Sequence, residues 1–145
     1  MPDAELIDAH QHVWDLAAHD QPWLAMPGNE PIRRTFTEAD LRPLALAAGV
    51  SATVVVQTVT EPAETTELLE LAAASDLVAC VVGWADLREA GVADALAALT
   101  GRRVGHLLRG LRHPLLTEPD PDWLLQPDVQ RGLTAAGDAG LCSGC

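Results

Sequence analysis

Two histidines stand one residue apart directly after a short apolar segment, in IDAHQHVWD at residues 7–15. If that segment is a strand, His10 and His12 point to the same face, because residues i and i+2 of a strand share a face. Two neutral imidazoles placed in this way can bind one divalent ion, and Zn²⁺ takes imidazole readily. The same spacing also fits two hydrogen-bonded or exposed histidines at a strand end, so the residue types alone leave both interpretations open.

Other polar side chains close later apolar segments. Arg112 and His113 end HLLRGLRH, Gln57 follows three valines, and Asp86 follows VVGWA. A planar guanidinium matches carboxylate geometry, so Arg112 could bind a carbonyl or an anion, whereas Gln57 and Asp86 point to no particular chemistry by themselves. The alternatives are a core ion pair for Arg112 and a helix cap for Asp86.

Composition excludes several classes of protein. The formal net charge is −12, which would repel a nucleic-acid backbone, and all nine basic residues are Arg, so no lysine is present for a Schiff base. The apolar runs are far shorter than the ~20 residues that span a bilayer, and no basic, apolar leader opens the sequence, so we expect a cytoplasmic protein without membrane contact. CSGC matches a C-x-x-C pattern but is a single pair at the end of the sequence.

Strand-like and helix-like segments alternate along the sequence, which predicts an α/β fold of parallel strands joined by helices. Four such units make half of a (β/α)8 barrel, and the polar residues after each strand favour this barrel over an open sheet. We predict one partial barrel domain over residues 1–145, with 138–145 as an aberrant tail. The strands are expected near 5–10, 52–58, 77–84 and 106–112, and the helices near 37–48, 60–74, 91–99 and 127–139.

The segments IDAHQHVWD, QPWL, VVVQTV, VVGWADL and LRGLRHPL, in this order, resemble the amidohydrolase-related family, which contains sugar-lactone hydrolases of the L-fuconolactonase and L-rhamnonolactonase types. The resemblance covers about residues 5–137. It implies a (β/α)8 barrel that opens a lactone by attack of an activated water. It also implies His10 and His12 as ligands of one divalent metal, zinc in first place, or a metal-independent site, with Arg112 and His113 as substrate ligands and Gln57 and Asp86 as weaker assignments.

The family's later strands carry further histidines and an aspartate that acts as base, and none of these is present in the sequence. We therefore leave the catalytic residues unassigned and expect the general base in the missing half. Two interpretations follow. The chain is either a lactone hydrolase that is incomplete as given, with a small-molecule lactone as its substrate, or an inactive half-barrel that self-associates or pairs with a partner through its exposed sheet edges.

Overall fold

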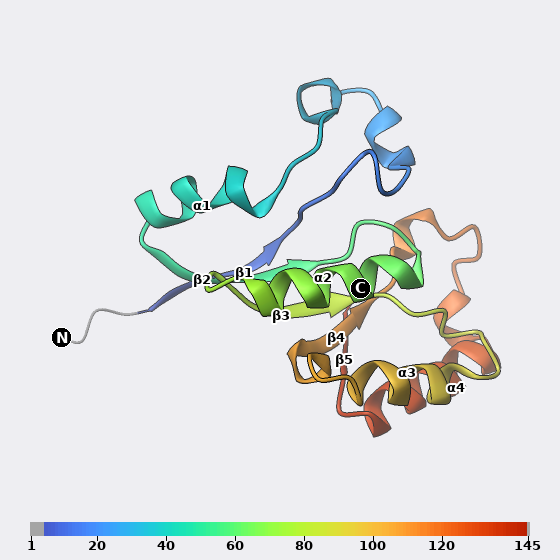
Figure 1. The fold of residues 1–145 in the computed structure, drawn as a ribbon. Coiled ribbons are helices and arrows are strands. Elements are labelled where there is room, and N and C mark those ends of the chain that lie inside the picture. Colours follow the sequence, from blue (N-terminus) through green and yellow to red (C-terminus); the bar gives the residue numbers. More distant parts are fainter. Residues whose placement is uncertain (1–4, 145) are drawn as a thin grey trace.

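The computed structural model describes residues 5–144, in which a single parallel sheet carries the fold (Figure 1). Each strand pairs in parallel with the next one along the chain, in the order β1-β2-β3-β4-β5. This order is what crossover connections through helices produce. The strands are β1 Leu6–Gln11, β2 Val50–Val56, β3 Val78–Gly83, β4 Leu108–Arg112 and β5 Cys142–Gly144.

A helix lies between each pair of consecutive strands, and all four agree with the sequence prediction to within about two residues at most ends. The N-terminus of α1 is held by a capping box between Thr37 and Asp40. Gly49 and Gly140, which follow α1 and α4, have φ values of +76° and +74°, a left-handed conformation that glycine adopts without strain. The helices are α1 Glu38–Ala47, α2 Pro62–Ala74, α3 Val92–Thr100 and α4 Pro127–Asp138.

The fourth strand is shorter than predicted, because residues 105–107 form a 3₁₀ turn and β4 begins only at Leu108. The amide of Leu107 donates to the carbonyl of Val104, so these residues make local turn bonds instead of ladder bonds. A β-rich composition does not reveal this, since the turn depends on bonds to the preceding residues.

The end of the chain continues the alternating pattern as far as it is described. After α4 and Gly140, β5 pairs with β4 in the register Gly110↔Cys142. Gly110 is needed there, because a Cβ atom would lie 2.8 Å from the carbonyl oxygen of Cys142. Cys142 is exposed, and Cys145, the other half of the C-x-x-C pattern, lies outside the described residues.

The core lies between the helices and the central strands, where Val55, Leu69, Val81, Leu96 and Val129 are fully buried. Burial varies along β3, where Val78 and Val81 are buried and Ala79 is exposed. The edge of the sheet formed by β1 is covered less well. Large apolar side chains of β1 and α1 are 51–70% exposed, and α1 stands apart from the other helices in Figure 1. These are Leu6, Ile7, Leu44 and Leu46.

Within residues 5–144, no helix combines the length and the apolar character needed to cross a membrane.

Candidate active site

His10 and His12 meet at the carboxyl end of β1. His10 lies in the strand and His12 one residue beyond it, and their Nε2 atoms are 3.1 Å apart. The rings are in an edge-on arrangement, with centroids 4.8 Å apart and an interplanar angle of 76°. The two imidazoles therefore lie together, as predicted from their spacing in the sequence.

The environment of His12 selects one form of its ring. Its Nδ1 lies 2.9 Å from the carbonyl oxygen of Val56, which can only accept, so Nδ1 carries the proton. Burial lowers the pKa of His12, and the positive charges of His10 and Arg112 lower it further, against the hydrogen bond to Val56. His12 is thus a neutral imidazole whose Nε2 lone pair faces His10, which is the form that binds metals.

The histidine pair fits two positions of a zinc ligand set. Two nitrogens 3.1 Å apart can both lie within the ~2.0–2.1 Å of one ion that Zn–N bonds require. Catalytic zinc usually has three protein ligands. Over residues 5–144, no group of three or more His, Cys, Asp or Glu side chains is arranged to hold a metal. Oδ1 of Asp8 accepts the amide of His10 at 3.1 Å.

Arg112, at the end of β4, binds a neutral partner instead of an acid. Its Nη1 donates to Oε1 of Gln57 at 3.2 Å, and Gln57 is 1% exposed. No carboxylate of residues 5–144 lies within ion-pair distance of Arg112, so the alternative of a core ion pair is wrong. The other N–H groups of the guanidinium are left to bind a ligand. Its positive charge is one of the causes that lower the pKa of His12.

His113 is beside Arg112, but both of its ring nitrogens are occupied. The indole N–H of Trp84 donates to Nδ1 at 3.1 Å, and Nε2 lies 2.6 Å from a carboxylate oxygen of Glu118. The ring also stacks on Trp123, with centroids 3.9 Å apart and an interplanar angle of 11°. A substrate that used either nitrogen would have to displace one of these partners.

Asp86 makes only a local contact among the described residues. Its carboxylate accepts the amide of Arg88 at 3.0 Å, in a turn after β3. The alternative of a helix cap is wrong, because α3 begins at Val92 with Gly91 in the capping position. No hydrogen bond in residues 5–144 joins Asp86 to the histidines or to Arg112.

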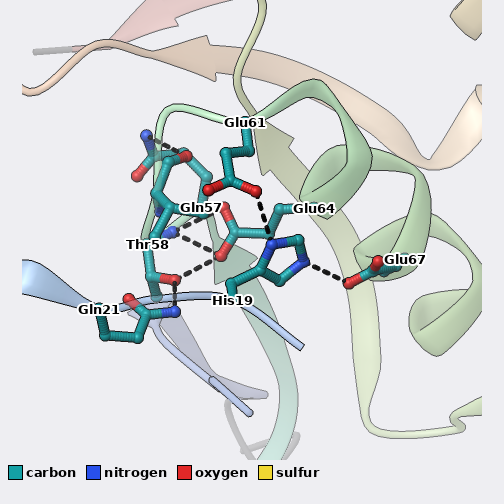
Figure 2. Close-up of polar contacts among 8 residues, drawn as sticks. His19, Gln21, Gln57, Thr58, Glu61, Glu64 and Glu67 are labelled. Atoms are coloured by element: carbon teal, nitrogen blue, oxygen red, sulfur yellow. Dashed lines mark hydrogen bonds and ion pairs between the residues drawn. The ribbon is translucent and has the colours of Figure 1, made fainter. Parts of the chain in front are cut away.

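A buried acid that the sequence did not single out lies next to this site. Glu64 of α2 is 4% exposed, and its carboxylate accepts the amides of Thr58 and Val59 and the hydroxyl of Thr58 (Figure 2). The available signal was its position as the third residue of α2, where an acidic side chain often accepts amides preceding the helix. Near it, the ring of His19, in the loop after β1, lies between the carboxylates of Glu61 and Glu67.

Comparison with known families matches residues 7–142 to the family described as amidohydrolase. The chain belongs to the amidohydrolase family. Similar curated amidohydrolases include the L-fucono-1,5-lactonase of Burkholderia ambifaria, 37% identical over 129 residues that cover 89% of this chain and 43% of the relative. The L-fucono-1,5-lactonase of Burkholderia multivorans is 40% identical over 114 residues, which cover 79% of this chain and 37% of the relative. This amidohydrolase chain therefore spans less than half the length of these relatives.

Solved amidohydrolase structures share the fold. A Burkholderia multivorans amidohydrolase with bound zinc is 35% identical, with a TM-score of 0.85 over 97% of this chain and 48% of the other. An amidohydrolase of Bifidobacterium longum subsp. infantis is 28% identical, with a TM-score of 0.66 over 97% of this chain and 51% of the other. The prediction of half of a (β/α)8 barrel is confirmed. The chain aligns with about half the length of each of these amidohydrolases.

Proposed function

We propose that this chain forms part of a hydrolase that opens a sugar lactone. The observation that carries the proposal is that His10, His12, Gln57 and Arg112 lie at the carboxyl ends of β1, β2 and β4. Active sites of barrel enzymes lie at this end of the strands. The lactonase relatives support a cyclic ester as the substrate class.

Lactone hydrolysis requires a water that attacks the carbonyl carbon and a positive group for the charge that develops on the carbonyl oxygen. The ring C–O bond then breaks and a hydroxy acid is released. Arg112 suits the second task, because its charge is not neutralised by an acid of the described residues and Gln57 holds it at 3.2 Å. The same guanidinium would bind the carboxylate of the product.

His10 and His12 would hold a divalent ion, zinc in first place, with their Nε2 atoms. Such an ion would lower the pKa of a bound water to ~7 and would polarise the carbonyl. The proton of His12 on Nδ1 keeps Nε2 free and its ring oriented through Val56. In this proposal the third ligand and the general base come from outside these 145 residues, in keeping with relatives more than twice as long.

Product binding tests the proposal on the chain itself. We expect L-fuconate, the hydroxy acid of L-fucono-1,5-lactone, to bind in isothermal titration calorimetry. Arg112→Gln should weaken the binding about tenfold, since a hydrogen bond to a charged group contributes about 1.5–3 kcal/mol. The control is Arg109→Gln, an exposed arginine of the same strand. Absence of binding, or equal losses in the two variants, would contradict the proposal.

A second candidate role is assembly with another copy of the chain. It is favoured by the exposure of four large apolar side chains on β1 and α1, namely Leu6, Ile7, Leu44 and Leu46. Exposed apolar side chains that gather on one part of a surface can mark an interaction site. In this alternative the half-barrel is inactive and its function lies in the assembly.

A further inference from the structure

We propose that Glu64 is a positioning residue of the candidate active site, which sets the orientation of the Gln57 amide and, through it, of Arg112. The inference rests on the proposed function for the role of Arg112 in ligand binding. The hydrogen bonds themselves do not depend on that function.

The carboxylate of Glu64 holds the segment that leads from β2 into α2. It accepts the amide of Thr58 at 2.9 Å, the amide of Val59 at 3.1 Å and the hydroxyl of Thr58 (Figure 2). These donors compensate for the burial of a charged group, which would otherwise be strongly unfavourable. Residues 58 and 59 are therefore fixed relative to α2, directly after Gln57.

The position of Val59 in turn selects which end of the Gln57 side chain faces Arg112. The amide nitrogen Nε2 of Gln57 donates to the carbonyl oxygen of Val59 at 3.4 Å, which leaves Oε1 to accept from Arg112 at 3.2 Å. A side-chain amide has donors at one end and an acceptor at the other. If the carbonyl of Val59 moved away, the Gln57 amide would keep only its bond to Arg112, and its position relative to the guanidinium would be less well fixed.

The β1–α1 loop is joined to the same network. Nε2 of Gln21 donates to the hydroxyl oxygen of Thr58 at 3.0 Å, and the indole N–H of Trp23 donates to Oε1 of Gln21 at 2.6 Å. Gln21 is buried, with 5% of its surface exposed. Thr58 thus donates its single proton to Glu64 and accepts one from Gln21, which makes Glu64 the acceptor on which the chain of bonds ends.

Replacement of the acid by its neutral isostere tests the proposal. Glu64→Gln keeps the shape of the side chain but turns an NH₂ group toward an amide donor. We expect the ¹⁵N–¹H resonances of the Gln57 side chain and of Arg112 Nε to move, and L-fuconate to bind roughly tenfold more weakly. The matched control is Glu70→Gln, an exposed acid of the same helix, which should leave both unchanged. A merely stabilising role would lower the melting temperature without moving these resonances.

The outcomes separate the inference from the proposed function. Moved resonances in a folded Glu64→Gln protein support the positioning role even if no variant and no wild-type protein binds L-fuconate, a result that would contradict only the proposed function. Resonances of Gln57 and Arg112 at their wild-type positions would overturn the inference.

A second pair of variants decides the question if Glu64→Gln does not fold. Thr58→Val removes the hydroxyl between Glu64 and Gln21, whereas Thr58→Ser retains it. We expect the Gln57 and Arg112 resonances to move in the valine variant and to return in the serine variant. Identical spectra for the two variants would overturn the inference.

Discussion

The indole N–H of Trp84 donates to Nδ1 of His113 over 3.1 Å, and this contact assigns the tautomer of the histidine. An indole nitrogen can only donate, so Nδ1 accepts this bond with its lone pair. The ring proton is therefore on Nε2, which is directed at Glu118. His113 is thereby held between strands β3 and β4 and the loop that follows β4.

Removal of the indole donor should release this tautomer. In Trp84→Phe we expect both tautomers of His113 to be populated in ¹⁵N spectra of the ring, and stability to fall by about 1 kcal/mol because a part-buried acceptor loses its partner. Urea unfolding gives the second value. Trp23→Phe is the control, since that indole also donates a hydrogen bond but to Gln21. An unchanged tautomer in Trp84→Phe would show that Glu118 alone selects it.

Zinc retention should depend on the histidine pair. We expect the protein to retain zinc after dialysis and the double variant His10→Ala/His12→Ala to retain none, because the two Nε2 atoms lie 3.1 Å apart and can both bind one ion. Mass spectrometry measures the metal content of each protein. His106→Ala is the control, as that histidine is exposed and its side chain has a hydrogen bond to the carbonyl of Arg103. Equal zinc content in the double variant and the wild type would reject the assignment.

The contact of His19 with two acids should make part of the stability depend on pH. The hydrogen bond to Glu67 raises the pKa of His19 above its ordinary value of 6.5, the bond to Glu61 adds to this, and burial acts against both. A group with a raised pKa in the folded state contributes fully below its unfolded pKa, about 6.5, and the contribution is lost as pH rises through the folded value. Protonated His19 donates to both carboxylates, at 2.8 and 2.7 Å, whereas the neutral ring can donate to one.

His19→Gln should therefore destabilise the protein near pH 6, by about 0.5–1 kcal/mol, because ion pairs with exposed acids are weak. The destabilisation should be much smaller near pH 9, where His19 has lost its proton. Urea unfolding across this range measures the difference. His106→Gln should show no such trend. A difference between wild type and His19→Gln that is constant from pH 6 to pH 9 would contradict the assignment.

Two glycines of α4 should respond in opposite directions to alanine. A Cβ atom on Gly132 would lie 2.1 Å from the carbonyl oxygen of Leu87, whereas one on Gly137 would meet nothing within 4 Å. Gly132→Ala should cost about 1–3 kcal/mol of stability through overpacking. Gly137→Ala should add about 0.5–1 kcal/mol, because alanine loses less backbone entropy in a helix. Thermal unfolding of the two variants compares them, and equal effects would show that α4 does not pack as described.

The exposed leucines of α1 should promote self-association. We expect sedimentation velocity to detect dimers or larger species, and Leu44→Gln/Leu46→Gln to shift them toward monomer, since these side chains are 70% and 59% exposed. Leu125→Gln, an equally exposed leucine in the β4–α4 loop, is the control. A monodisperse wild-type monomer would exclude the second candidate role.

Local sequence patterns determined most of the secondary structure and the order of the sheet. Alternating β-rich and helix-rich segments predicted parallel strands, and the helix expected at 37–48 matches α1 to within one residue, because its capping residues Thr37 and Gly49 act within one turn of the chain. The pairing of His10 with His12 also followed from the sequence, since two residues separated by one position need only a strand to bring them together.

Only the tertiary structure decided which side chains are partners across the fold. Arg112 binds Gln57, 55 positions away, although the sequence offers 21 acids as alternatives, and Glu64 accepts donors from the loop before its own helix. Such partners depend on which strand ends are neighbours and on which donors are withdrawn from water. Residue types state what a side chain can bind, whereas the geometry of β2, β4 and α2 determines what lies within hydrogen-bond distance of it.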